Sequence, residues 1–249
     1  MRTSLPLLVA LIAFATQAHA SGVFVRWGQC LSDGGVQNKN FACDANTGSE
    51  VLVGGFQLTS DLAQVSGNEV VIDLASAGAS LPAWWQFRNA GTCRQTAMTM
   101  NTFLSTGVNC IDWAAGQSQG GIGAYAIGQR GPNTARVVAA LAVPVSGLAD
   151  LSTGQEYFSF NLVITHAKTV GLGACAGCQT PVCLLLVSIN LTTPIAANNR
   201  KLVNPSNGTD ANWVTWQGGG GVTVGGATGC PAATPTLQRT WGAVKALYR

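Results

Sequence analysis

Nucleophilic catalysis by this chain would depend on a single side chain. The chain has two histidines, His19 and His166, and His19 lies in an N-terminal segment with the features of a cleaved leader. A Ser-His-Asp or Cys-His site would therefore have to use His166, at the end of an apolar run. A zinc site built from three histidines is excluded by the same count. The histidine content thus argues against an enzyme.

Acidic residues offer a second route to catalysis, because glycosidases use two carboxylates about 5–9.5 Å apart. The chain has 10 Asp and Glu residues. Glu69 and Asp73 would share one face of a predicted strand, but at about 3.3 Å per residue they would lie roughly 13 Å apart. A carboxylate-dependent hydrolase is therefore a less favoured hypothesis.

Eight cysteines could form disulfides or bind a metal. An even number in a secreted chain predicts disulfides that staple the loops. The alternatives are a zinc site of Cys175, Cys178, Cys183 and Cys230, or a redox-active Cys175-x-x-Cys178 motif. Short spacing along the chain predicts the pairs Cys30–Cys43 and Cys93–Cys110. The remaining four cysteines are expected to pair among themselves, as Cys175–Cys183 and Cys178–Cys230.

No cofactor is expected, with calcium as the alternative. The segments Asp44–Gly48 and Asn204–Asn212 offer several side-chain oxygens each. Neither has the spacing of an EF-hand loop, and each contains one carboxylate. Turns in which Asn and Asp bond to the backbone explain both segments equally well.

Tryptophan is the most suggestive residue type, with seven in the chain. A Trp ring can stack on a sugar or fill the core of a β-sheet protein. Adjacent residues of a strand face opposite sides, so at most one of Trp84 and Trp85 should be in the core. By the same argument one of Trp213 and Trp216 should face outward. The candidate ligand-binding residues are Trp84, Trp85, Trp213 and Trp216.

The N-terminus has the three parts of a secretory signal. Arg2 precedes the apolar run Leu5–Ala15, and Ala18–Ala20 forms an A-x-A cleavage site. The run is about half the ~20 residues needed to span a bilayer, so no membrane span is predicted. We expect a signal peptide at residues 1–20, a single domain at 21–249, and a secreted, extracellular or cell-surface protein.

The rest of the chain has an all-β pattern of short apolar segments between Gly, Pro, Asn, Ser and Thr. It predicts a single antiparallel β-sandwich of jelly-roll or lectin-like kind. Cys93, Ala97, Met100 and Leu104 form a helical stripe after a Thr92 capping box, so a short helix is predicted near 92–104. The predicted strands are Val23–Trp27, Glu50–Leu58, Glu69–Ala75, Trp84–Arg88, Ile122–Ile127, Thr134–Val143, Glu156–His166, Val182–Thr192, Trp213–Gln217 and Gly221–Val224.

The segments Pro82–Arg94, Cys175–Cys183 and Trp241–Arg249 resemble stretches of uncharacterised secreted bacterial proteins. The resemblance implies a bacterial, secreted protein. It implies no activity, ligand or site residue.

Composition narrows the function further. A net charge of +3 with 9% charged residues argues against nucleic-acid binding, which needs a concentrated basic surface. The first hypothesis is a non-catalytic module that binds a glycan or surface polymer through Trp and amide side chains. The second is a self-associating structural subunit of an extracellular layer, fibre or matrix, because low charge does little to keep copies apart.

Overall fold

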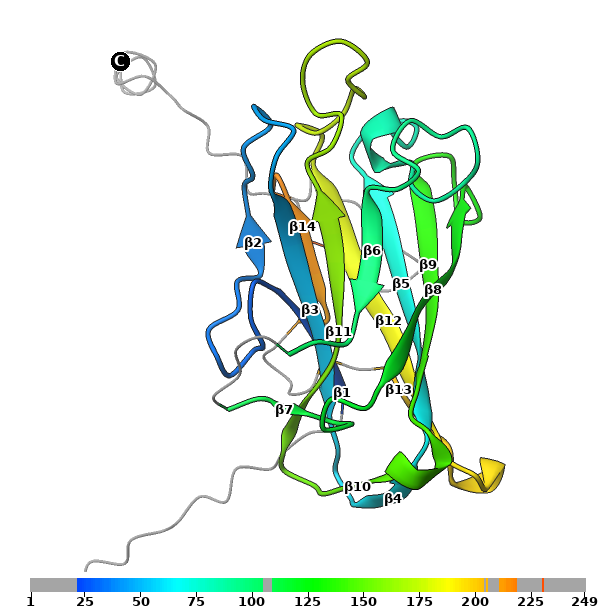
Figure 1. Ribbon diagram of the computed structural model, residues 1–249. Helices are drawn as coiled ribbons and strands as arrows, with labels where there is room; N and C mark the ends of the chain where they lie inside the picture. Colours follow the sequence, from blue (N-terminus) through cyan, green and yellow to red (C-terminus); the bar gives the residue numbers. More distant parts are fainter. Residues whose placement is uncertain (1–21, 105–108, 204, 206–210, 219–229, 231–249) are drawn as a thin grey trace, which may run out of the picture.

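The protein is a β-sandwich, as the strand pattern predicted (Figure 1). The computed structural model describes residues 22–104, 109–203, 205, 211–218 and 230. The signal segment 1–20, the predicted strand 221–224 and the chain end 241–249 lie outside the described residues. Within the described residues, the search for a helix long and apolar enough to cross a membrane found none.

The first sheet has the strand order β1-β3-β11-β6, and β7 also pairs with β11, at Tyr157 and Phe158, whereas β6 pairs with Asn161–Ile164. The pairings are antiparallel except that of β7 with β11. Its strands are β1 (Gly22–Trp27), β3 (Ser49–Gln57), β6 (Met98–Asn101), β7 (Ile111–Asp112) and β11 (Glu156–Thr165).

The second sheet has the order β2-β14-β12-β5-β9-β8, and β13 also pairs with β12. Strands β4 (Leu62–Val65) and β10 (Ala149–Leu151) form a separate pair. Three short 3-10 helices are η1 (Ala83–Trp85), η2 (Val145–Gly147) and η3 (Ala196–Asn198). The strands of the second sheet are β2 (Asn38–Lys39), β5 (Gly67–Ser76), β8 (Gln119–Ile127), β9 (Thr134–Ala142), β12 (Val182–Thr192), β13 (Arg200–Leu202) and β14 (Trp213–Trp216).

The main core lies between the two sheets, because alternate residues of each strand face inward. Strand β12 is buried over most of its length and lies between β5 and β14, so it is a central strand of the second sheet. The inward side chains include Leu52, Phe56, Ile72, Leu74, Val137, Phe160, Leu162, Leu184 and Leu186.

A β-bulge in β11 changes which of its residues face the core. The register with β3 shifts between Phe158 and Phe160, and a bulge inserts one residue that breaks the alternation. Tyr157 therefore joins the main core, whereas Phe158 packs on the outer face of the first sheet with Phe24 and Val53. Strict alternation along β11 would instead place Phe158 in the main core with Phe160 and Leu162, and Tyr157 on the outer face.

The predicted helix near 92–104 is wrong. Met98–Asn101 forms β6, in which Met98 is buried and Met100 is partly buried while Thr99 is exposed. The sequence of this segment fits both the two-residue period of a strand and the period of a helix. Hydrogen bonding to β11 stabilises the strand. The Thr92 hydroxyl donates to the Asn89 carbonyl at 2.7 Å, in a turn rather than a capping box.

All four predicted disulfide pairs are wrong, although the prediction that all eight cysteines are oxidised is confirmed. A disulfide needs Cα atoms about 4.4–6.8 Å apart, and strand pairing, not spacing along the chain, brings the cysteines together. Cys175 and Cys178 have different partners, which also contradicts the zinc and redox alternatives. The observed pairs are Cys30–Cys110, Cys43–Cys178, Cys93–Cys175 and Cys183–Cys230, separated by 80, 135, 82 and 47 residues.

Candidate functional site

Three of the four candidate tryptophans lie inside the protein. Trp84, Trp85 and Trp216 have no exposed surface. Trp84 and Trp85 lie in η1 rather than in the predicted strand Trp84–Arg88. Since a 3-10 turn does not send adjacent side chains to opposite faces, both rings are buried, and the expectation that at most one is in the core is wrong.

These rings belong to an aromatic cluster that we define as Trp27, Phe41, Trp84, Trp85, Phe87 and Trp216. Their indole groups hold the surrounding loops. The Trp84 Nε1 donates to the Thr169 Oγ1 at 3.1 Å and the Trp216 Nε1 to the Cys178 carbonyl at 2.7 Å. The aromatic cluster therefore acts as packing for the loop end of the sandwich, with no ring face open to a ligand.

A buried cation completes the aromatic cluster. The Arg94 guanidinium lies 3.5 Å from the centroid of the Trp84 ring. It donates to the carbonyls of Trp84 and Ala167 at 2.9 Å, and to that of Thr165. Burial lowers the pKa of Arg94 to about 9, so the side chain stays protonated at neutral pH. Arg94 thus ties the η1 loop to the end of β11.

Trp213 faces the other way, as the alternation in β14 predicted. It is half-buried and packs on the outer face of the second sheet beside Cys183, Leu185 and Cys230. A ligand role for Trp213 stays a prediction.

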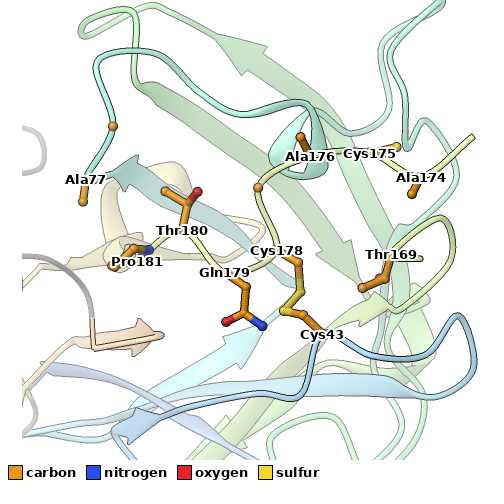
Figure 2. A pocket seen from close by; sticks show the side chains of 12 residues that line it. Cys43, Ala77, Thr169, Ala174, Cys175, Ala176, Cys178, Gln179, Thr180 and Pro181 are labelled. Atoms are coloured by element: carbon orange, nitrogen blue, oxygen red, sulfur yellow. A yellow bond between two sulfur atoms is a disulfide. The ribbon is translucent and has the colours of Figure 1, made fainter. Parts of the chain in front are cut away.

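A hollow of about 790 Å³ lies around the Cys43–Cys178 disulfide (Figure 2). It adjoins the aromatic cluster, because the Trp216 Nε1 donates to the carbonyl of the lining residue Cys178. Its wall contains the Cys43–Cys178 disulfide and the side chains of Thr169, Gln179 and Thr180. The other lining residues are Ala, Gly, Pro and the further cysteine Cys175. This hollow offers mainly backbone and small side chains, without an aromatic face for stacking.

The ring that is available for stacking is Phe103. Among the aromatic side chains of the described residues it is the exposed one, with 72% of its surface accessible, and Trp213 is half-buried. Phe103 follows the end of β6, at the outer face of the first sheet.

Two asparagines hold the Phe103 backbone on both sides. The Phe103 amide donates to the Asn101 Oδ1 at 3.1 Å, an Asx turn that ends β6. The Asn161 Nδ2 on β11 donates to the Phe103 carbonyl at 2.8 Å and to the Asn101 Oδ1 at 3.1 Å. An exposed ring on a fixed backbone loses less freedom when it binds a ligand, which is the benefit of preorganisation.

Hollows flank the ring on two sides, and both are lined by Asn101, Phe103 and Leu104. We call the first, of about 260 Å³, the valine hollow, and the second, of about 460 Å³, the glycine hollow. The other lining residues of the valine hollow are Gly28, Gln29, Cys30, Val51, Val53, Asn161 and Val163. Those of the glycine hollow are Thr102, Asp112, Gly116, Ser118 and Gln119.

The sequence analysis missed Phe103 because it considered only tryptophans as stacking residues and predicted a helix near 92–104. The sequence nevertheless contains a pattern that indicates an outward position for Phe103. If residues 98–103 alternate as a strand, Met98 and Met100 point inward, and Thr99, Asn101 and Phe103 have the outward parity.

The remaining catalytic candidates have structural partners. The His166 Nε2 lies 3.1 Å from the Glu50 Oε1, and Glu50 also pairs with Lys39. Asp73 pairs with Arg136 at 2.6 Å and with Arg130 at 3.2 Å, and Glu69 accepts a bond from the Asn190 Nδ2. These contacts give Glu50, Asp73 and Glu69 structural roles.

Gly116–Gly120 matches the G-x-S-x-G pattern of a nucleophile elbow, so the expectation that the sequence contains no such motif is wrong. That motif requires a strand followed by a helix, but here it leads into strand β8. The Ser118 Oγ is buried without a protein partner among the described residues, and the His166 ring is bonded to Glu50. The described residues thus form no Ser-His-Asp site around Ser118.

Metal binding has no support in the contacts of the described residues. Cys30, Cys110 and Glu156 lie within 4.8 Å of one another, but both sulfurs belong to one disulfide and offer no thiolate. In the candidate calcium segment Asp44–Gly48, the Asn46 Oδ1 accepts from the amides of Thr169 and Val170. The segment 204–212 lies mostly outside the described residues.

Comparisons with known proteins do not assign a family. No protein-family model matches the chain, and no curated protein matches it. A similar solved structure is a cohesin module from a family 33 glycoside hydrolase of Clostridium perfringens. The two chains share 7% identity at a TM-score of 0.36, over 79% of this chain and 93% of the other. A likeness this low indicates nothing about the function of this chain.

Proposed function

We propose that the protein is an extracellular, non-catalytic module that binds a neutral glycan or cell-surface polymer against Phe103. The observation that carries the proposal is the exposed Phe103 ring, whose backbone is held between Asn101 and Asn161. Aromatic faces beside amide groups suit sugars, because the ring packs on the C–H face and the amides bond to hydroxyls.

The chemistry of the rest of the protein supports this proposal. Four disulfides fit an oxidising compartment, as does the signal pattern at residues 1–20. His166, Glu50, Asp73 and Glu69 are engaged in structural contacts, which supports binding rather than catalysis. The binding residues differ from the sequence prediction, because the Trp84, Trp85 and Trp216 rings are buried.

A glycan array tests the proposal. The oxidised full-length chain is compared with Phe103→Ala, and loss of the stacking contact should weaken binding by about tenfold or less, since aromatic contacts contribute roughly 0.5–1.5 kcal/mol. Leu172→Ala is the matched control, because Leu172 is a fully exposed apolar side chain on the β11–β12 loop. Its binding should equal that of the wild type.

The proposal is rejected if no glycan binds, or if Phe103→Ala and Leu172→Ala bind alike. Selective binding lost on Trp213→Ala would instead move the ligand to the outer face of the second sheet.

Self-association is a second candidate, favoured by the edge strand β8. Strand β8 lies at the end of the second sheet and contains no charged residue, and Gly123 and Ala124 are exposed. Native edge strands commonly carry charges or bulges that prevent pairing with another chain; β8 has a bulge between Ile122 and Ala124 but no charge. The test is solution mass and negative-stain microscopy of the wild type and Ala124→Lys. Oligomers or fibres that the lysine abolishes support it, and a wild-type monomer at all concentrations rejects it.

A further inference from the structure

We infer that the ligand is an extended, uncharged polysaccharide chain that crosses the Phe103 ring and places sugar units in both flanking hollows. This inference rests on the proposed function and narrows it to a substrate class. The volumes are its starting point. Sites that enclose a whole small ligand measure about 300–1,000 Å³. The valine hollow, at about 260 Å³, is smaller than this range, and the glycine hollow, at about 460 Å³, lies in its lower part.

The two hollows have a common wall. Asn101, Phe103 and Leu104 line both of them, so a ligand that leaves one hollow over the ring enters the other. A free monosaccharide would use one hollow and one ring face. A chain can use both hollows at once, with its central unit on Phe103.

Unused hydrogen-bonding groups are present on each side of the ring. In the valine hollow, the Asn161 Nδ2 donates to the Asn101 Oδ1 and to the Phe103 carbonyl. The Asn161 Oδ1 has no protein partner among the described residues. The Gln29 side chain is likewise without a described partner. In the glycine hollow, the same holds for the Gln119 side chain. A chain that crosses the ring can therefore bond to side-chain amide groups on both sides.

The charge of the two linings selects against acidic polymers. The described lining residues include no Lys, Arg or His. The one acid is Asp112, whose carboxylate oxygens accept from the amides of Ala114 at 2.9 Å and Gly116 at 2.8 Å. A uronic or sulfated chain would therefore meet a negative charge with no compensating cation, whereas a neutral chain avoids this repulsion.

Chain length is the first variable in the test. Calorimetry measures the affinity of the oxidised full-length chain for cello-, xylo- and chito-oligosaccharides, from the monosaccharide to the hexasaccharide. We expect at least one series to gain about tenfold or more in affinity between the disaccharide and the tetrasaccharide, as both hollows become filled.

Flank variants then test whether both hollows are used. Gln29→Ala and Gln119→Ala change one hollow each, and each should weaken tetrasaccharide binding about two- to tenfold, the loss expected for one hydrogen bond. Leu172→Ala again serves as the unchanged control. Equal affinity for the monosaccharide and the hexasaccharide would overturn the extended-chain inference, as would an effect confined to one flank variant.

Charge is tested by affinity electrophoresis in hydroxyethylcellulose and carboxymethylcellulose, which have the same backbone. Stronger retardation by the neutral polymer is expected, and stronger retardation by the anionic one overturns the neutral class. These results would reject the extended neutral chain while leaving glycan binding at Phe103 in place. The proposed function itself fails by a different result, in which no glycan binds or Phe103→Ala leaves binding on the array unchanged.

Discussion

The aromatic cluster and the Phe103 site use the same kind of side chain in opposite ways. In the cluster, Trp84, Trp85 and Trp216 are fully buried, and two of the three indole nitrogens bond to loops. At the other site a single ring is 72% exposed, and the hydrogen bonds go to its backbone. The difference shows two uses of an aromatic residue. A buried ring whose side chain is hydrogen-bonded stabilises the fold, whereas an exposed ring whose backbone alone is hydrogen-bonded leaves its face available to a ligand.

The largest expected effect comes from the aromatic cluster. Trp216→Ala removes a ring that contacts Trp27, Phe41, Trp84 and Trp85, and truncation of a buried aromatic costs about 3–5 kcal/mol. Denaturant unfolding measures the loss. Trp213→Ala, at a half-buried position of the same strand, should lose less. An equal loss for both variants would contradict the comparison.

A disulfide beside the cluster should come next. The double variant Cys43→Ala, Cys178→Ala opens a link between residues 135 positions apart, and loss of a native disulfide costs about 2–5 kcal/mol. We expect lower stability under oxidising conditions and unchanged glycan binding. Peptide mapping of the wild type supplies the control, because a Cys30–Cys43 peptide would contradict the observed connectivity.

Phe103→Ala should leave the free energy of unfolding within about 0.5 kcal/mol of the wild type, as for other exposed positions. Its ring contributes little to packing because most of it faces solvent. Urea denaturation measures the stability of Phe103→Ala and of the wild type, and the glycan array measures the binding of the same two proteins. A large loss of stability would show that the ring packs in solution and is not a binding surface.

The smallest effect concerns pH. Glu156 is buried and accepts from the Ser32 amide, and burial raises its pKa above the ordinary value of 4.5. In the window just above 4.5 the folded state therefore binds more protons than the unfolded state, so the free energy of unfolding falls as pH rises through it. Glu156→Gln cannot ionise and should flatten this part of the stability profile. The free energy of unfolding is measured by urea or thermal unfolding at a series of pH values. If it falls with pH as steeply in Glu156→Gln as in the wild type, Glu156 is not the group responsible.

Local patterns predicted most of the β-sandwich. Short apolar segments between turn-forming residues were sufficient to locate Ser49–Gln57, Thr134–Ala142 and Val182–Thr192, because strands of a sandwich bury apolar side chains and end at exposed turns. The pattern was misleading at β6, where the helical and strand periods both fit. It was also misleading at η1, where a 3-10 turn buries adjacent tryptophans.

The proposed site keeps the expected chemistry but differs from the sequence prediction in position. Aromatic and amide groups were the expected binding residues, and the site that we propose consists of Phe103, Asn101 and Asn161, because three of the four tryptophans are buried. Exposure depends on what packs against a side chain, and for Trp216 that includes residues from β1 and η1, far away in the sequence.

By itself, the amino-acid sequence determined most of the long strand segments, the oxidised state of the cysteines and the scarcity of histidine. Each follows from residue type or from neighbours a few positions apart. The tertiary structure alone decided which cysteines pair and which ring is exposed. Cys30 meets Cys110 across 80 residues, and Asn161 reaches Phe103 across 58, because strand pairing sets these contacts and no local pattern encodes such a separation.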